Sequence, residues 1–401
     1  MGKELKRILM FHGTDVCRNT LNLFSDAVAK ELRKKGIEVG FVELYQDDQR
    51  LLENYDREMG MGFDAAIAFN AAGQQSTTIG GVNVFDYMEV PFFNWLVDHP
   101  CDHVTDVESG PDDYHVICID RDHVDFVNKY FDNIAGSHFI PLGGWEMNVP
   151  MINKEDFSNR EYDFIYTAGT FPLENIIDKI RTMLPDNIQK VALDMIDIML
   201  DDRSVNNESA LRMSLDGNGI EVPNNEFKDY AYITSMTNLF VRTYVRDELI
   251  AYIADAGIGL HLFGNGWEKL EDKGNIILHG SVSYEESVKL CEKAKLSLNV
   301  MPWFKDGIHD RIPTAMLGGS AVLTDTTGYL KEKFIGEGDG QDILFYDISR
   351  PDMVGEIIRE IQNDKDRLYE IAMNGQKKAA NELTWSHRVD ELIGVINASI
   401  G

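Results

Sequence analysis

The feature that most constrains the fold is an alternation of continuous apolar runs with segments of helical period, which occurs twice along the chain. Runs that are apolar at every position are typical of strands covered on both faces by helices. Helical connections between such strands predict parallel pairing through right-handed crossovers. We therefore expect an α/β domain in the first part of the chain. Its predicted strands are 7–11, 37–44, 63–70, 91–98, 114–120 and 137–142.

The alternation resumes after a polar connection at 143–160. A predicted strand at 162–169 is followed by a segment, 172–255, of helical period without a convincing strand, which we interpret as a helical insertion. We expect one domain over 1–155, a second over 156–383, and a last helix over 384–401. The later predicted strands of the second domain are 257–264, 276–280, 296–300 and 320–324.

Composition excludes several classes of protein. The chain has 67 acidic and 38 basic side chains, a formal charge of −29, which would repel a nucleic-acid backbone. No apolar run approaches the roughly 18 to 20 residues that span a bilayer, and no signal-peptide pattern opens the sequence, so we expect a cytoplasmic protein. The four cysteines, Cys17, Cys101, Cys118 and Cys291, are scattered, which fits reduced thiols.

The segment 302–330 is the most informative for function. Open α/β sheets bind ligands at the carboxyl ends of their strands. Asp310 is expected to cap a helix at 311–317, and such a helix end attracts anions. Arg311, His309 and Lys305 would add contacts to a diphosphate. The alternative is a local ion pair and cap on an exposed turn.

This segment resembles the donor-binding stretch of GT-B glycosyltransferases, nearest the spore-maturation-type (CgeB-like) group and more distantly the retaining family-4-like enzymes. Arg311, Ala315, Gly318 and Gly319 match the group's pattern. Thr314 stands where that pattern has a ribose-binding glutamate, and Asp306 stands at the first acid of the retaining family's pair. The resemblance covers most of 257–400.

The resemblance implies two facing Rossmann-like domains, with the acceptor on the first and a nucleotide-sugar donor on the second. It also implies that the last helix packs back on the first domain. The implied donor contacts either follow predicted strands or lie at the start of the helix at 311–317. For the turn Gly264–Gly266, and for Gly169 and Thr170 at the end of a predicted strand, a purely structural role stays open. These residues are Gly169, Thr170, Asn265, Gly266, Ser281, His309, Asp310, Arg311 and Thr314.

Catalytic candidates follow strands of the first domain. His12 follows the first predicted strand and could act as general base, with Asp15 or Asp98 orienting its ring. The alternative is a histidine that packs or caps at a strand end. His99 is the other candidate, because retaining GT-B enzymes place a donor-facing histidine at a similar loop.

Two patterns suggest metal sites instead. His99, Cys101 and His103 alternate as zinc ligands could, although no partner pair accompanies them. Asp120 and Asp122 form a D-x-D pattern, which in single-domain GT-A enzymes holds a divalent ion. Because the second half has its own alternation, we interpret Asp122 as a helix cap.

The sequence thus predicts a glycosyltransferase that moves a sugar from a nucleotide-sugar to a hydroxyl of a glycan, protein or small molecule. It is expected to need no cofactor and no obligatory metal. Inversion and retention stay open, as do a homo-oligomer, a sugar-nucleotide epimerase, the GT-A enzyme, and a non-catalytic carbohydrate-binding scaffold.

Overall fold

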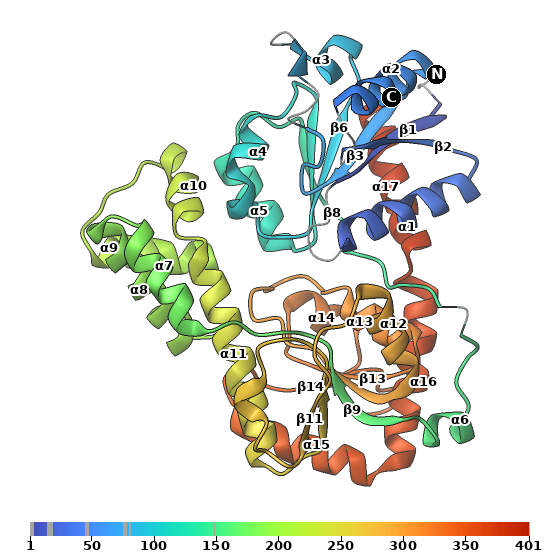
Figure 1. Ribbon diagram of the computed structural model, residues 1–401, viewed down its shortest axis with the longest axis vertical. Helices are drawn as coiled ribbons and strands as arrows, with labels where there is room; N and C mark the ends of the chain where they lie inside the picture. Colours follow the sequence, from blue (N-terminus) through green and yellow to red (C-terminus); the bar gives the residue numbers. More distant parts are fainter. Residues whose placement is uncertain are drawn as a thin grey trace. The chain divides into compact units, whose positions relative to one another are not determined.

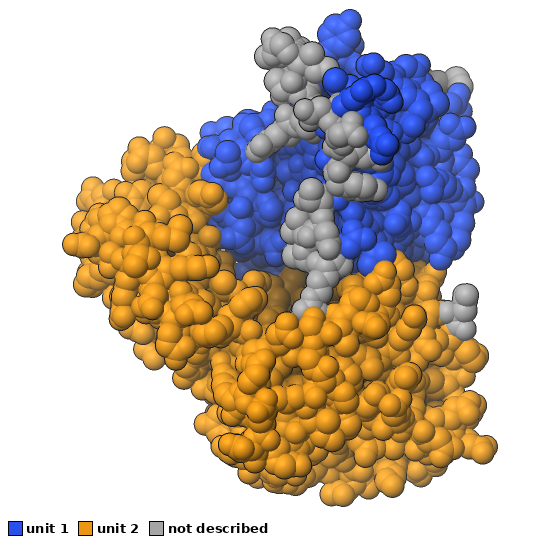
Figure 2. Space-filling model, in the orientation of Figure 1, with its two compact units in different colours: residues 1–143, 385–401 blue, residues 144–384 orange. Residues whose placement is uncertain are grey.

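The computed structural model describes residues 4–13, 19–44, 48–74, 78–79, 82–147 and 149–400 (Figure 1). The chain forms two compact units, coloured separately in Figure 2. Unit 1 comprises Met1–Gly143 and Trp385–Gly401, and unit 2 comprises Gly144–Thr384.

Unit 1 contains a six-stranded parallel sheet in the order β2-β1-β3-β6-β7-β8. Its central strands are buried at every position, as expected for a sheet covered by helices on both faces. A two-stranded antiparallel pair, β4 (Thr78–Ile79) and β5 (Val82–Asn83), lies outside the sheet. The sheet strands are β1 (Arg7–His12), β2 (Glu38–Glu43), β3 (Ala65–Phe69), β6 (Phe92–Leu96), β7 (Tyr114–Cys118) and β8 (Gly136–Phe139).

The last helix of the chain, α17 (Trp385–Ile400), belongs to unit 1 and lies beside α1 (Thr20–Lys34) (Figure 1). The Trp385 ring packs against Phe24, at 5.4 Å between ring centroids, and against Trp95, at 6.0 Å. A segment distant in sequence therefore completes this core. The other helices are α2 (Asp48–Met61), α3 (Val84–Met88), the 3₁₀ turn η2 (Pro100–His103), α4 (Val104–Glu108) and α5 (Arg121–Tyr130).

Unit 2 contains a second six-stranded parallel sheet, in the order β11-β10-β9-β12-β13-β14. The two sheets confirm the predicted α/β fold class. The two-residue strand β14 was not predicted, because so short a run carries no periodic pattern. The strands are β9 (Tyr162–Tyr166), β10 (Leu260–Leu262), β11 (Ile276–Leu278), β12 (Ala294–Leu298), β13 (Ala321–Thr324) and β14 (Leu344–Phe345).

The segment 172–255 is helical, and its last helix, α11, leads back to β10 of the sheet (Figure 1). Helix α12 begins with a capping box: the Ser283 side chain accepts from the Glu286 amide, and the Glu286 side chain accepts from Ser283 N. The helices are α6 (Lys154–Ser158), α7 (Leu173–Met183), α8 (Asp186–Asp201), α9 (Asn207–Gly217), α10 (Asn224–Ile233), α11 (Met236–Asp255), α12 (Tyr284–Lys293), α13 (Arg311–Leu317), α14 (Gly328–Lys333), α15 (Val354–Asn363) and α16 (Lys365–Glu382), with 3₁₀ turns η3 (Glu268–Leu270) and η4 (Pro351–Met353).

The structure divides the chain after Gly143, earlier than the expected boundary at 155. Hydrogen bonds hold the connecting segment to unit 2: Gly144 N donates to Leu383 O at 2.7 Å, and Ile152 N donates to Gln376 Oε1 at 2.8 Å. These contacts join residues far apart in sequence. The polar character of the segment 143–160 therefore could not show where unit 1 ends and unit 2 begins.

Candidate functional site

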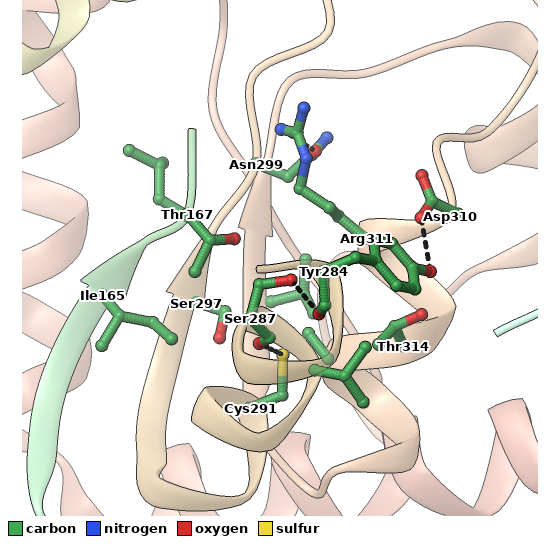
Figure 3. Close-up of a pocket in the computed structure, with 14 residues that line it drawn as sticks. Ile165, Thr167, Tyr284, Ser287, Cys291, Ser297, Asn299, Asp310, Arg311 and Thr314 are labelled. Carbon is green, nitrogen blue, oxygen red and sulfur yellow. Dashed lines mark hydrogen bonds between the residues drawn. The ribbon is translucent and has the colours of Figure 1, made fainter. Parts of the chain in front are cut away.

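The topology of unit 2 places a ligand-binding edge at the carboxyl ends of β9 and β12. The strand β9 pairs with β10 on one side and with β12 on the other, so strand order reverses there, where open α/β sheets bind ligands. A pocket lies at this point between α12 and α13 (Figure 3). Its lining residues are Ile165, Thr167, Tyr284, Ser287, Val288, Cys291, Ser297, Leu298, Asn299, Asp310, Arg311, Thr314, Ala315 and Val322.

A connected set of polar side chains forms one wall of the pocket. The Tyr284 hydroxyl donates to Asp310 Oδ2 at 3.0 Å, and His309 Nδ1 lies 2.6 Å from Asp310 Oδ1. Arg311 Nη2 lies 3.1 Å from His309 Nε2, and Arg311 Nη1 donates to Asn299 Oδ1 at 3.4 Å. Figure 3 shows Arg311 and Asn299 at one end of the pocket and Cys291 at the other.

Charge and burial fix the protonation of this set. Burial lowers the pKa of His309, and the positive charge of Arg311 lowers it further, which favours the neutral ring. Burial alone would raise the pKa of Asp310, which is 5% exposed, but His309 and Arg311 hold it below its usual value. Asp310 is therefore a carboxylate that accepts hydrogen bonds and positions its neighbours.

The predicted cap at Asp310 is wrong. Asp310 has helical backbone angles and makes no side-chain cap hydrogen bond, because Tyr284 and His309 occupy its carboxylate. The first-turn amides are also engaged: Ile312 N donates to His309 O, Thr314 N donates to Asp310 O, and Pro313 has no N–H. At the start of α13 an anion would therefore be attracted by side chains rather than by free backbone amides.

Thr314 and Cys291 complete the pocket floor. The Thr314 hydroxyl accepts from Trp145 N at 3.1 Å, so the residue that replaces the expected glutamate is part of the packing beside Tyr284. Burial raises the pKa of the Cys291 thiol to about 12, which makes it an inert side chain rather than a nucleophile.

Two arginines of α11 belong to this region and were missed by the sequence reasoning. Arg242 and Arg246 lie one helical turn apart, with guanidinium carbons 5.5 Å and 5.0 Å from the Trp303 ring centroid. The Trp303 ring lies 5.9 Å from that of His309. Burial lowers the pKa of Arg246 to about 10, and the charges of Arg311 and Arg242 act in the same direction. The sequence carried one signal for this pair, namely two arginines four residues apart in a chain rich in acidic residues.

The predicted donor residues after β9 and β10 hold two loops together. Thr170 N donates to Asn265 O at 2.9 Å, and the Thr170 hydroxyl donates to Asp247 Oδ1 at 2.6 Å. Gly266 has a φ of +89°, and a Cβ there would lie 2.4 Å from Thr170 O. Gly169 and Ser281 are also absent from the pocket lining. The structure thus gives Thr170, Asn265 and Gly266 packing roles near the site.

His12 in unit 1 lies between two carboxylates. Its Nδ1 is 3.1 Å from Glu43 Oε1, its Nε2 is 3.1 Å from Asp26 Oδ1, and its ring stacks on Phe41 at 4.1 Å. Burial lowers its pKa, but Asp26 and Glu43 outweigh burial and raise it above the ordinary value.

The expectation that Asp98 orients His12 is wrong, because Glu43 and Asp26 lie at the two ring nitrogens, and Asp98 instead accepts a hydrogen bond from Asn70 Nδ2 at 2.9 Å. The other acid considered, Asp15, lies outside the described residues.

One residue of the histidine pattern and one of the D-x-D pattern cap helices in the structure. His99 Nδ1 accepts from Cys101 N at 3.0 Å and caps η2. Asp120, not Asp122, caps α5, since Asp120 Oδ1 accepts from Asp122 N at 2.9 Å. In the ranges that the structure describes, no three His, Cys, Asp or Glu side chains are grouped to hold a metal ion.

Most of the pocket lining belongs to a part of the chain that resembles a known protein family. Residues 242–394 match the family described as "Glycosyl transferase-like". Over this range the chain is similar to that family. This match confirms the expected enzyme class at the level of the family, and it spans Arg242, Arg246, the pocket helices and Arg311. No curated protein sequence matches the chain.

Solved GT-B structures share the fold. HepE of Anabaena, solved with UDP and glucose, aligns with a TM-score of 0.54 at 12% identity over 98% of this chain and 100% of its own. Sucrose-phosphate synthase of Thermosynechococcus elongatus has a TM-score of 0.54 at 10% identity, covering 98% of each chain. BGT of phage T4, solved with its UDP-glucose substrate, has a TM-score of 0.51 at 11% identity, covering 99% of each. The GT-B fold is thereby confirmed, and the single-domain GT-A alternative is wrong.

No helix in the described ranges combines the length and the apolar character that crossing a bilayer requires.

Proposed function

We propose that this protein is a glycosyltransferase that moves a sugar from a nucleoside-diphosphate sugar to an acceptor hydroxyl. One observation carries the proposal: at the switch point of a glycosyltransferase-like domain, the described residues offer the Arg311 guanidinium no carboxylate within ion-pair distance. An unpaired cation at a ligand-binding edge suits an anionic ligand, especially in a chain of formal charge −29.

The proposed reaction breaks the bond between the anomeric carbon and the diphosphate oxygen, and the bonding electrons leave with the diphosphate. The acceptor oxygen bonds to the anomeric carbon and gives up its proton. Arg311 stabilises the charge that develops on the leaving diphosphate, and Asp310 and neutral His309 hold Arg311 in place.

For acceptor activation we propose His12 as the base in an inverting reaction. Asp26 is more exposed than Glu43, so Asp26 is the partner that the ring would release to receive the proton while Glu43 orients it. Asp98 and His99 stay predictions as further catalytic residues. Placement in the CgeB-like group rests on the spacing from Arg311 to Gly319, and metal independence and a cytoplasmic location stay predictions as well.

A thermal-shift panel of UDP-, GDP-, CMP- and dTDP-sugars tests the donor. We expect one nucleoside-diphosphate sugar to stabilise the protein; a ligand at 100 times its Kd contributes about 2.7 kcal/mol. UDP-glucose is the first choice because HepE and phage T4 BGT are both solved with it. No shift with any donor would instead favour a carbohydrate-binding scaffold.

Turnover assays then test the chemistry. Arg311→Gln should lower kcat by about 10²- to 10³-fold, while Arg350→Gln, at an exposed arginine paired with Asp352, should leave it unchanged. Activity equal to wild type in Arg311→Gln would remove the proposed diphosphate contact. Persistence of turnover in EDTA would support metal independence, and conversion of the donor without any acceptor would indicate an epimerase.

A further inference from the structure

The connection 299–310 lies between β12 and α13 and leads directly into the pocket residue Arg311. We propose that the helical insertion holds this connection in place through one side chain, Lys305, and thereby positions Arg311 for the donor. Lys305 is thus a positioning residue rather than a diphosphate contact. The inference rests on the proposed function and gives the segment 172–255 a role in it.

The Lys305 ammonium joins the connection to the insertion. Its Nζ donates to Arg203 O, in the turn between α8 and α9, at 2.7 Å, and to Pro302 O at 2.8 Å. Hydrogen bonds from an ionised donor are roughly twice as strong as those between neutral groups. Two backbone carbonyls, one from each segment, therefore fix the orientation of this side chain.

Arg203 is a firm anchor because its side chain is attached to α11. Its Nη2 lies 3.2 Å from Glu248 Oε2, and its guanidinium carbon lies 5.5 Å from the centroid of the Tyr244 ring. The turn itself is closed by Asp202, whose Oδ1 accepts from Ser204 N at 2.9 Å. The Arg203 side chain is 11% exposed, so these contacts are shielded from water and hold its carbonyl in place.

The main chain of the connection is held from a second side. Gly328 N donates to Lys305 O at 2.8 Å, and the Thr327 hydroxyl donates to Gly307 O at 2.7 Å, which attaches the connection to the start of α14. An irregular segment of this length adopts many conformations unless such contacts order it. Loss of the Lys305 side-chain contact leaves the contacts with α14, so the connection should loosen rather than unfold.

The effect of this contact reaches the pocket through His309. The His309 ring lies 5.9 Å from the rings of both Trp303 and Phe304, the two residues before Lys305. Its Nε2 lies 3.1 Å from Arg311 Nη2. A donor that binds a loosened site must order it, and part of the binding free energy is then lost. We therefore expect Lys305 to act on donor affinity.

Calorimetric titration of the full chain with UDP-glucose measures the effect. Lys305→Met should weaken donor binding by about 10-fold, and Lys305→Arg, which keeps a charged donor, should recover most of that loss. Arg203→Met keeps the carbonyl but frees it from α11, so it should weaken binding by about 3-fold. Lys190→Met, at an exposed lysine of α8 paired with Asp194, is the matched control and should bind as wild type does.

A double-mutant cycle separates this role from a direct contact with the diphosphate. If both side chains act through the one contact, the variant that carries both Lys305→Met and Arg203→Met should bind about as weakly as Lys305→Met alone. Losses that multiply to about 30-fold, or wild-type affinity in Lys305→Met, would overturn the assignment.

Amide hydrogen exchange of the ligand-free chain tests the contact without a donor. The amides of 301–310 should exchange faster in Lys305→Met than in wild type, and at the wild-type rate in Lys190→Met. Unchanged exchange in Lys305→Met would overturn the positioning role even where donor affinity falls. Failure of wild type to bind any nucleotide-sugar would instead refute the proposed function, and the exchange comparison would still decide whether Lys305 orders the connection. Should Lys305→Met fail to fold, Lys305→Gln carries the same comparisons.

Discussion

The ring of His12 is held between Asp26 and Glu43, and this placement sets both its charge and its availability as a base. Two neighbouring carboxylates favour the protonated imidazole over the neutral form that a base requires. The neutral form that a base requires is therefore populated at a higher pH than in an ordinary histidine. Such an arrangement suits a structural role at low pH and a catalytic one at higher pH.

This placement predicts a pH dependence of stability. Because the pKa of His12 is higher in the folded chain than the ordinary value of about 6.5, its contribution is fully present below that pH and is lost as the pH rises through the raised pKa. The difference in unfolding free energy between wild type and His12→Gln should thus be larger at pH 6 than at pH 8. Denaturant titrations at both pH values measure it.

Asp26→Asn serves as the comparison, since it removes one carboxylate and keeps the ring. The window of pH dependence should move to lower pH in that variant. A constant difference between wild type and His12→Gln across this range would show that the two carboxylates do not raise the histidine pKa.

At the scale of elements, α17 is the clearest case of a helix whose position is decided by tertiary packing. Trp385 is buried among Phe24, Phe69 and Trp95 of unit 1. Its helix follows α16 of unit 2 along the chain, so unit 1 depends on a segment that comes after unit 2 in the sequence.

Trp385→Ala should lower the stability of unit 1 by about 3 to 5 kcal/mol, the usual cost of deleting a buried aromatic side chain. Asn397→Ala, on the exposed side of the same helix, should change it little. Chemical denaturation followed by circular dichroism measures both. A loss below 1 kcal/mol for Trp385→Ala would contradict the role of this ring in the core.

The sequence could predict those elements that depend on local pattern. Continuous apolar runs located the buried strands of both sheets. The cap at Asp310 was misplaced because Tyr284, 26 positions away, takes its carboxylate. Arg246 was missed because Trp303 and Arg311, which lie near it, come from distant parts of the sequence, and its four-residue spacing from Arg242 was the one local signal.

At the scale of the whole molecule, the two units each have a sheet and a core of their own. A strongly acidic chain nevertheless gathers Arg242, Arg246 and Arg311 at one edge of unit 2. The global charge repels polyanions, while under the proposed function the local arginine group binds one small anion.

The separation of cores predicts two calorimetric transitions that respond to different changes. UDP should raise the transition of unit 2, where Arg246 and Arg311 lie, and Trp385→Ala should lower that of unit 1. Differential scanning calorimetry with and without UDP measures both. A single transition that moves as one under either change would show that the units unfold together.

The return of α17 to unit 1 has a consequence for biosynthesis. A nascent chain normally completes its amino-terminal domain while the ribosome is still translating the next one. Here the helix beside α1 emerges only after Gly144–Thr384 has been translated, so unit 2 has all its residues before unit 1 has its last helix. Until Trp385–Ile400 has been translated, the aromatic side chains that receive Trp385 stay uncovered, and chaperone binding at this stage would protect them.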